Sequence, residues 1–385
     1  MTEAPRKRRV IAVIAAILLV GISLLGFWAY RSLNSNISTI DSGQGLGDVR
    51  PEKENESMNI LAIGSDSRAG ENAEIGGESP GLADTTLLVH LSADNSWATV
   101  VSIPRDSMVQ MPECERADGT TQPAGMRQFN SAYSTGGPVC VQRTIESLTG
   151  LRVDHFAVVD FQGFQAMVDA VGGVTVYIED PISDPNSKIY FKAGCQTLNG
   201  EQALDYVRVR HGAGDGSDTG RIARQQAFLA SLMQKVTSAG VLTNPVALYD
   251  FLDAATGSVT TDTGLGSIPA MASLAARVRE IGLNRIDFLT VPNEPYPPNR
   301  NRLQWVSDAD DLWEQLRSDQ PLSTPEPSDS ASASPTEGTA GGATAEGEAS
   351  ASPSRSSQGK PATPSSSATS TFDTNSADEP VCPTE

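Results

Sequence analysis

A long apolar run opens the chain. Residues 10–30 contain no polar stripe of the kind that marks one face of a helix packed inside a domain. About 20 apolar residues, at about 1.5 Å each, cross a hydrocarbon core of about 30 Å. The apolar part of a cleaved signal peptide has only about 7–15 residues. The run ends in Phe27, Trp28 and Tyr30, whose rings suit a membrane–water interface, so it predicts one transmembrane helix.

Further along, short β-branched runs alternate with stretches of helical periodicity. Such alternation predicts one α/β domain, a central β-sheet sandwiched by helices in an α-β-α arrangement. The predicted strands are residues 59–63, 85–91, 98–103, 155–159, 174–178 and 286–291. The predicted helices are residues 141–148, 161–171, 200–206, 221–238, 245–255, 268–280 and 308–317.

Composition changes near residue 321, where Ser, Thr, Pro, Ala, Gly and Glu replace the apolar residues. A segment of this kind cannot offset its ordering entropy by burial, which predicts disorder. We therefore divide the chain into a basic tail (1–9), a transmembrane helix (10–30), a linker (31–57), a folded domain (58–320) and a disordered tail (321–385).

Charge indicates the orientation. A basic cluster at residues 6–9 precedes the apolar run, so the N-terminus is expected in the cytoplasm and the domain outside the cell membrane. The net charge of −19 argues against a nucleic-acid partner, because phosphate backbones select basic surfaces.

The 4 cysteines fit an oxidising exterior. Cys114 and Cys140 bracket a segment rich in Gly and Pro, and we expect a disulfide between them. Four cysteines allow three pairings, so the partners of Cys195 and Cys382 stay unassigned.

Two carboxylates stand beside predicted strand ends. Asp66 follows the strand 59–63 and Asp84 opens the next one. Either residue can also serve only in a turn or cap. Together they provide hard oxygen ligands for Mg²⁺ (or Mn²⁺), which takes one or two carboxylates along with phosphate oxygens and water.

An arginine-rich stretch follows at residues 206–211. Its alternation, read as a strand, predicts that Arg208 and Arg210 project from one face. The long helix that comes next begins near Asp218 or Thr219, either of which can cap it.

Arg221, Arg224 and Gln225 share one side of that helix. Cations in a first turn oppose the helix dipole unless an anion binds there. The alternatives are a solvated basic face and pairing of these arginines with Asp215 and Asp218. Arg105, after the strand 98–103, adds a guanidinium group and favours a polyanion pocket. The sequence has no P-loop, GxSxG, HExxH or CxxC pair, and its three histidines are spaced unlike zinc ligands.

The sequence resembles the LytR-CpsA-Psr family of cell-wall glycopolymer ligases, in particular its actinobacterial members. The matching stretches are NILAIGSDSR (59–68), ADTTLLVHL (83–91), VSIPRDS (101–107), FNSAYSTGGP (129–138), LTGLRVDHFAVVDFQGFQAMVDAVGGV (148–174), AGCQTLNGEQALDYVRVRH (193–211) and GRIARQQAF (220–228).

The resemblance implies an α-β-α sheet with a groove for a polyprenyl chain. It places the metal-binding acids at Asp66 and Asp84. It implies that pyrophosphate is bound by Arg105, Arg208, Arg210, Arg221 and Gln225, with Arg68 and Arg224 nearby.

Three positions depart from the family pattern. Leu82 stands where many members carry an arginine, and an insertion at 69–81 separates the two acids. Tyr177 stands where related chains often carry a cysteine able to pair with the one at Cys195.

The resemblance also implies an activity. We expect a phosphotransferase that moves a glycopolymer from polyprenyl pyrophosphate to peptidoglycan, with Asp84, Arg105 and Arg221 as catalytic residues. Arabinogalactan is the favoured polymer, and a teichoic-acid-like or capsular polymer is the alternative. A polyprenyl pyrophosphate phosphatase and a non-catalytic lipid- or glycopolymer-binding regulator stay open as other functions.

Overall fold

The computed structural model describes most of the chain up to Leu322 and a short part of the C-terminus. The described residues are 4–43, 45–47, 49–66, 81–116, 118–210, 212, 218–322, 372, 374–378 and 381–382. Two expected features, the insertion 69–80 and the pyrophosphate contact at Arg68, therefore lie outside them.

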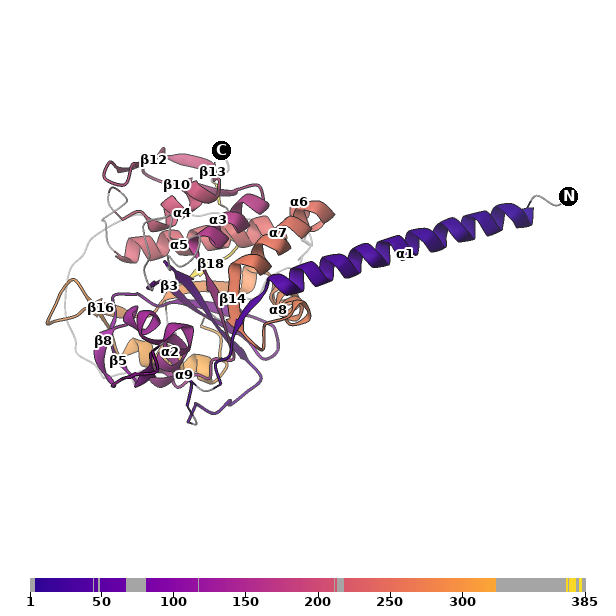
Figure 1. The fold of residues 1–385 in the computed structure, drawn as a ribbon. Coiled ribbons are helices and arrows are strands. Elements are labelled where there is room, and N and C mark those ends of the chain that lie inside the picture. The colour runs from indigo at the N-terminus through magenta and orange to yellow at the C-terminus, as the bar shows by residue number, and fades with distance from the viewer. Residues whose placement is uncertain are drawn as a thin grey trace, which may run out of the picture.

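A single long helix projects from the domain (Figure 1). This helix, α1, spans Ala4–Asn36, and its part from Ile11 onward is long and apolar enough to cross a membrane. The helix thus runs past the predicted end at residue 30. Near its end, the Trp28 ring stacks on Tyr249 with ring centroids 6.5 Å apart, and Asn36 Nδ2 donates to Asp253 Oδ1 at 2.9 Å. These contacts join the apolar helix directly to the domain.

Among the described residues, eight strands form one mixed central sheet. Its middle strand β2 pairs parallel with β9 and antiparallel with β3, and β15 extends the sheet parallel to β4. In spatial order the strands are β1 (Ser38–Ile40), β14 (Val259–Asp262), β9 (His155–Val159), β2 (Met58–Ser65), β3 (Ala83–Leu91), β4 (Ala98–Ser102), β15 (Ile286–Thr290) and β18 (Asn375–Ser376).

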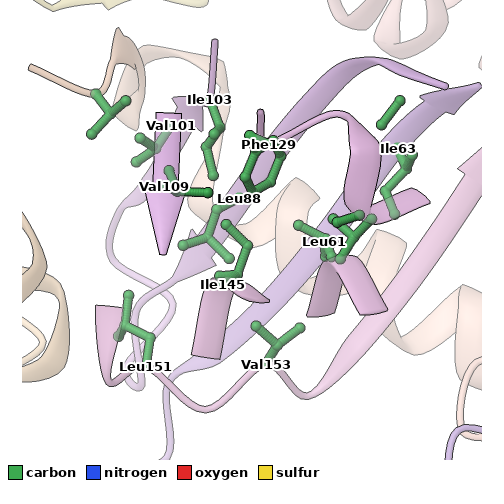
Figure 2. Close-up of a cluster of buried hydrophobic side chains, with 14 of the residues drawn as sticks. Leu61, Ile63, Leu88, Val101, Ile103, Val109, Phe129, Ile145, Leu151 and Val153 are labelled. Carbon is green, nitrogen blue, oxygen red and sulfur yellow. The ribbon is translucent and has the colours of Figure 1, made fainter. Parts of the chain in front are cut away.

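Helices cover both faces of this sheet, which confirms the predicted α-β-α architecture. Leu61 and Ile63 of β2 face the cluster built by α2 (Ser131–Thr149) and α9 (Asp308–Arg317), and Figure 2 shows part of this core. Ile60 and Ala62 face the opposite cluster, built with α5 (Asp218–Thr237) and α8 (Ile268–Ile281). Successive residues of a strand point to opposite faces, so a sheet covered on both sides needs an almost continuous apolar run.

A second, smaller core lies against α5. Its helices are α3 (Phe161–Ala170), α4 (Gly200–Arg208), α6 (Ala239–Leu242) and α7 (Pro245–Ser258). Local capping fixes where they begin: the Asp160 side chain accepts from the Gly163 N–H, and Asn199 forms a capping box with Gln202. These caps place α3 and α4 beside the sheet edge that carries the candidate site.

Two-stranded antiparallel sheets complete the described fold, and none of these strand pairings was predicted. They pair β10 (Val174–Ile178) with β13 (Gly194–Leu198), β11 (Ile182–Asp184) with β12 (Ile189–Phe191), β5 (Met108–Met111) with β8 (Gly125–Gln128), β6 (Cys114–Glu115) with β7 (Thr121–Gln122), and β16 (Asn293–Pro295) with β17 (Leu303–Trp305). Only the strand at 174–178 is among the predicted elements.

Two disulfides connect distant parts of the chain. Cys114 bonds to Cys140, the pair expected from the sequence, and Cys195 bonds to Cys382, a pairing that the sequence left open. The second bond belongs to a C-terminal segment that differs from the predicted disordered tail. There β18 pairs with β15, and Ala377 is fully buried, with its N–H donating to the Ile286 carbonyl at 2.9 Å.

Candidate functional site

A pocket of about 380 Å³ lies where β2, β3, α3, α4 and α5 meet the loop after β4. We call it the donor pocket. Part of its lining is charged or polar, contributed by Asp84, Arg105, Arg208, Arg210, Arg221 and Gln225. The rest is largely apolar and includes Phe161, Phe164, Met167, Leu204, Phe228 and Leu232. One pocket therefore combines cationic side chains with a broad apolar surface.

Three of its charged side chains, Asp84, Arg105 and Arg221, belong to one continuous cluster of ion pairs. Arg105 Nη1 donates to Asp84 Oδ1, and Arg105 Nε lies 3.8 Å from Asp106 Oδ2 and 3.7 Å from Asp218 Oδ1. Arg221 Nη2 lies 2.5 Å from the same Asp218 oxygen. The fold thus brings together Asp84, Arg105 and Arg221, three residues that are widely separated in sequence.

Backbone contacts hold this cluster in place. The Asn130 N–H, just before α2, donates to the Arg105 carbonyl oxygen at 3.1 Å. On the helix side, the buried Gln226 donates through Nε2 to the Ser102 hydroxyl at 2.9 Å. This contact, about two turns into α5, fixes the helix beside the end of β4, where Arg105 follows.

Burial leaves part of the cluster without hydrogen bonds. The Arg221 side chain is only 4% exposed, and the Nε atoms of Arg105 and Arg221 are buried without a hydrogen-bond partner. A buried donor without a partner destabilises the fold by about 1–3 kcal/mol, more when it is charged. An anion rich in acceptor oxygens, such as a phosphate ester, would satisfy these donors.

Burial shifts the pKa values of two members of the cluster, Asp218 and Arg221. Burial raises the pKa of Asp218 above its ordinary value, although Arg221 and Arg105 act in the opposite direction. Burial likewise lowers the pKa of Arg221, against the influence of Asp218. The ion pair between Asp218 and Arg221 is one of the Arg–Asp pairings that the sequence offered as an alternative to an anion site. Asp215 lies outside the described residues.

Residues 206–208 of the stretch predicted as a strand at 206–211 are helical, so that prediction is wrong there, and His211 lies outside the described residues. α4 continues to Arg208, and the chain becomes extended only at Val209 (φ −58°, ψ 134°). The alternation Tyr-Val-Arg-Val-Arg resembles a strand, but the capping box at Asn199 starts a helix that extends into it. Arg208 and Arg210 still line the same pocket, because the chain leaves the helix between them.

Arg224 and Gln225 have different surroundings despite being neighbours. Gln225 lines the pocket and donates through Nε2 to the Val207 carbonyl oxygen at 3.2 Å. Arg224 Nη2 donates to the Val209 carbonyl oxygen, and the residue is not among those that line the pocket. In this structure, Arg224 therefore connects α5 to the end of α4.

Asp66 and Asp84 lie on neighbouring strand ends. Ser65 pairs with Ala83 across the β2–β3 hairpin, and the Asp66 N–H donates to the Leu82 carbonyl oxygen at 3.2 Å. Within the described ranges, no three or more His, Cys, Asp or Glu side chains converge on a metal position. A Mg²⁺ ion that also binds substrate phosphates needs only one or two carboxylates. Of this pair only Asp84 lines the donor pocket, and the Asp66 side chain accepts a hydrogen bond from the Leu82 N–H.

Asp106 was not singled out from the sequence. Its Oδ1 accepts from Arg302 Nη1 at 2.7 Å, and its Oδ2 faces Arg105 Nε. Adjacency to Arg105 was the available signal, but neighbouring residues in a chain often point apart. The contact from Arg302 depends on a segment almost two hundred residues away.

The chain matches one family model and is similar to proteins named for cell wall biosynthesis. Residues 29–318 match the model of the LytR_cpsA_psr family. The chain is 34% identical to the probable cell wall biosynthesis protein LcpB and 32% identical to the cell wall biosynthesis protein LcpA, both of Corynebacterium glutamicum. These matches cover 67% and 75% of this chain, and the chain spans 60% of the length of each relative.

Solved structures give a consistent result. The LytR-Csp2A-Psr enzyme from Actinomyces oris shares the fold, with a TM-score of 0.55 at 21% identity over 73% of this chain and 95% of that one. Bacillus subtilis TagV matches with a TM-score of 0.51 at 28% identity over 69% of this chain and 96% of that one.

Proposed function

The chain belongs to the LytR_cpsA_psr family, and on that premise we propose that it is a membrane-anchored phosphotransferase. It moves a phosphate-linked glycopolymer from a polyprenyl pyrophosphate carrier to peptidoglycan. A related Bacillus subtilis protein, 31% identical over 60% of this chain, is a polyisoprenyl-teichoic acid–peptidoglycan teichoic acid transferase. For the polymer we keep the expectation from the family resemblance, arabinogalactan, with a teichoic-acid-like or capsular polymer as the alternative.

One observation carries the proposal: buried guanidinium groups with unsatisfied N–H donors share a pocket with a large apolar lining. A lipid pyrophosphate has the matching two parts, a polyanion and a hydrocarbon chain. Arg105 and Arg221 bind the pyrophosphate, and the phenylalanine-rich lining holds the prenyl chain. Placement of the domain outside the membrane gives it access to both carrier and wall.

The reaction is a displacement at phosphorus. A hydroxyl group of peptidoglycan, the C6 hydroxyl of N-acetylmuramic acid, attacks the glycan-side phosphorus. The new P–O bond forms as the phosphoanhydride bond breaks, and polyprenyl phosphate leaves with the bonding electrons. Arg105 and Arg221 stabilise the charge that develops on the phosphate oxygens.

Asp84 takes the proton of the attacking hydroxyl. In the described structure, its Oδ1 accepts from Arg105. A bound pyrophosphate competes for that guanidinium group, which frees the carboxylate to act as a base. Asp66 and Asp84 are the residues that would hold Mg²⁺ or Mn²⁺, which would neutralise further charge on the pyrophosphate. In that case metal ligation, in place of proton transfer, would be the role of Asp84.

The test uses the full-length chain in detergent or nanodiscs with Mg²⁺, a polyprenyl pyrophosphate-linked saccharide and peptidoglycan fragments, with products read by mass spectrometry. We expect a glycan joined to the fragment by a phosphodiester, and its loss in Asp84→Ala. Asp250→Ala, at an exposed position of α7, is the matched control and should retain activity.

Two other outcomes would replace the proposal. Release of polyprenyl phosphate without any modified peptidoglycan would identify a phosphatase. Tight binding of the lipid donor without turnover, together with an Asp84→Ala chain that still complements a deletion strain, would identify a binding protein.

A further inference from the structure

A second cavity, of about 460 Å³, lies beside the Cys114–Cys140 disulfide. We call it the disulfide-side cavity. It is formed by β6, the first turns of α2 and the segment after β1, and its polar lining comes from Asp41, Glu115, Arg116, Tyr133, Ser134 and Thr135. Its charged groups are two carboxylates and one guanidinium. The lining lacks the phenylalanine-rich surface of the donor pocket, so the disulfide-side cavity does not suit a prenyl chain.

The cavity is built by the break within α2. Gly136 (φ −141°, ψ 29°) and Gly137 (φ 62°, ψ −156°) depart from helical geometry, and Pro138 follows them. A Cβ atom on Gly136 would lie 2.5 Å from the Glu115 carbonyl oxygen, so only glycine permits the approach of β6. The disulfide joins the same two elements covalently.

Tyr133 connects the disulfide-side cavity with a wall of the donor pocket. It lines the disulfide-side cavity, and its hydroxyl group shares a hydrogen bond with the buried Ser65 side chain, next to Gly64 of the donor pocket. Burial raises the pKa of Tyr133, and the nearby carboxylates of Asp160 and Asp66 raise it further. Tyr133 is therefore close to the proposed metal-binding acid as well as to a wall of the donor pocket.

The start of α2 also contacts Arg105 directly. Asn130, three positions before Tyr133, donates its N–H to the Arg105 carbonyl oxygen at 3.1 Å. The start of α2 is thus hydrogen-bonded to the loop that carries Arg105, and its next residues line the disulfide-side cavity.

We infer that the disulfide-side cavity binds the acceptor, a peptide-bearing saccharide of peptidoglycan, while the donor pocket binds the lipid pyrophosphate. This inference rests on the proposed function, because a transferase needs a second substrate beside the reacting phosphate. The lining offers Ser134 and Thr135 hydroxyls and the Tyr133 ring for a sugar. Its mixed charges match the carboxylates and amino groups of a stem peptide.

The experiment measures acceptor kinetics with the full-length chain, a fixed donor concentration and a disaccharide–peptide fragment of peptidoglycan as the varied substrate. Ser134→Trp places a large ring in the cavity from an exposed position. Ser273→Trp, at an exposed position of α8, is the matched control. We expect Ser134→Trp to raise the acceptor KM at least about tenfold. Release of polyprenyl phosphate without acceptor should match that of the control.

A charge reversal gives an independent measurement. Arg116→Glu adds a third carboxylate to the lining, and Arg279→Glu makes the same change at an exposed site on α8. Only Arg116→Glu should weaken binding of the fragment, measured by calorimetry without donor.

The outcomes distinguish failure of the acceptor inference from failure of the proposed function. If the wild-type chain transfers glycan but both cavity variants keep the acceptor KM and fragment affinity of their controls, the acceptor inference is wrong and the proposed function stands. A wild-type chain that neither transfers glycan nor releases polyprenyl phosphate overturns both.

Discussion

The arginines of the donor pocket are surrounded by carboxylates, which supply the counter-charge that a substrate anion would otherwise supply. Arg105 contacts Asp84, Asp106 and Asp218, and Arg221 contacts Asp218. Without these acids, two largely buried guanidinium groups would lack any counter-charge, at a cost of several kcal/mol each. Because the acids leave the Nε donors unsatisfied, a polyanion can still improve on them.

At this scale the geometry of one guanidinium group can be tested. We predict that Arg221→Ala lowers the rate of glycan transfer by about 10²–10³, the usual loss when one charge-stabilising donor is removed. Arg221→Lys should recover little of it, because an ammonium group cannot reproduce the planar set of donors. Arg105→Ala should lose transfer in the same way.

Rates of polyprenyl phosphate release and transfer, measured for the same preparations, check this prediction. Arg279→Ala, on the exposed side of α8, is the control for loss of a positive charge. Unchanged circular dichroism would show that each variant keeps its fold. Full activity of both Arg221→Ala and Arg105→Ala would remove these residues from the site.

Single residues also mark the limit of reasoning from sequence. Arg105 and Arg221 were selected because cations after a strand and in a first helical turn indicate an anion, and the structure brings them together. Arg224 satisfied the same spacing rule, yet it contacts a backbone carbonyl outside the pocket lining. Spacing along a helix defines a side of that helix, but not which neighbour lies against it.

Among the elements, the contact of α3 with α7 positions much of the apolar lining of the donor pocket. Phe164 and Met167 belong to α3, whose Gly163 faces Ser258 at the end of α7. A Cβ atom on Gly163 would lie 2.3 Å from the Ser258 Cβ and 3.1 Å from its Cα. The absence of a side chain therefore sets how closely the two helices approach.

We predict that Gly163→Ala destabilises the chain by about 1–3 kcal/mol, since overpacking forces the helices apart. Gly257→Ala is the matched control: a Cβ there meets no atom within 4 Å, and alanine should stabilise α7 by up to about 1 kcal/mol. Urea unfolding in detergent, followed by tryptophan fluorescence, measures both. Equal midpoints for the two variants would show that the α3–α7 contact is not tight.

The element boundaries show where periodicity is informative. The strand at 59–63 was predicted from a short apolar run, as expected for a sheet covered on both faces, and the strand at 85–91 from its β-branched residues. The stretch at 206–211 was misassigned because alternation over five residues fits the end of an amphipathic helix equally well. The capping box at Asn199 starts the helix that runs into this stretch, and Asn199 lies before the alternating residues.

For the whole molecule, the C-terminus changes how the domain is closed. Cys382 is bonded to Cys195, and β18 adds an edge strand beside β15. The carbonyl oxygen of the buried Ala377 accepts from Gln234 Nε2 of α5 at 2.8 Å, on the helix that also carries Arg221. The C-terminal segment thereby contacts the sheet edge and the back of the substrate-binding helix.

We predict that the double variant Cys195→Ser/Cys382→Ser lowers the free energy of unfolding by about 2–4 kcal/mol, because the bond closes a long loop in the unfolded chain. The variant with Ser376→Ala alone, which keeps the disulfide, should stay within about 0.5 kcal/mol of the wild type. The check is to compare the urea unfolding midpoints of both variants and the wild type under non-reducing conditions. An unchanged midpoint in the double variant would mean that the tether does not stabilise the domain.

Sequence alone determined the apolar helix that is long enough to span a membrane, the alternating strands and helices, and the arginine and aspartate residues that make up the candidate site. These properties depend on neighbours within a few turns of chain, where periodicity and capping act. The tertiary structure decided which arginines meet in one pocket, which acids face them, and how the C-terminus returns to the sheet. Those contacts join residues such as Asp84, Arg105 and Asp218 across long separations, so they follow from packing and register that no local pattern encodes.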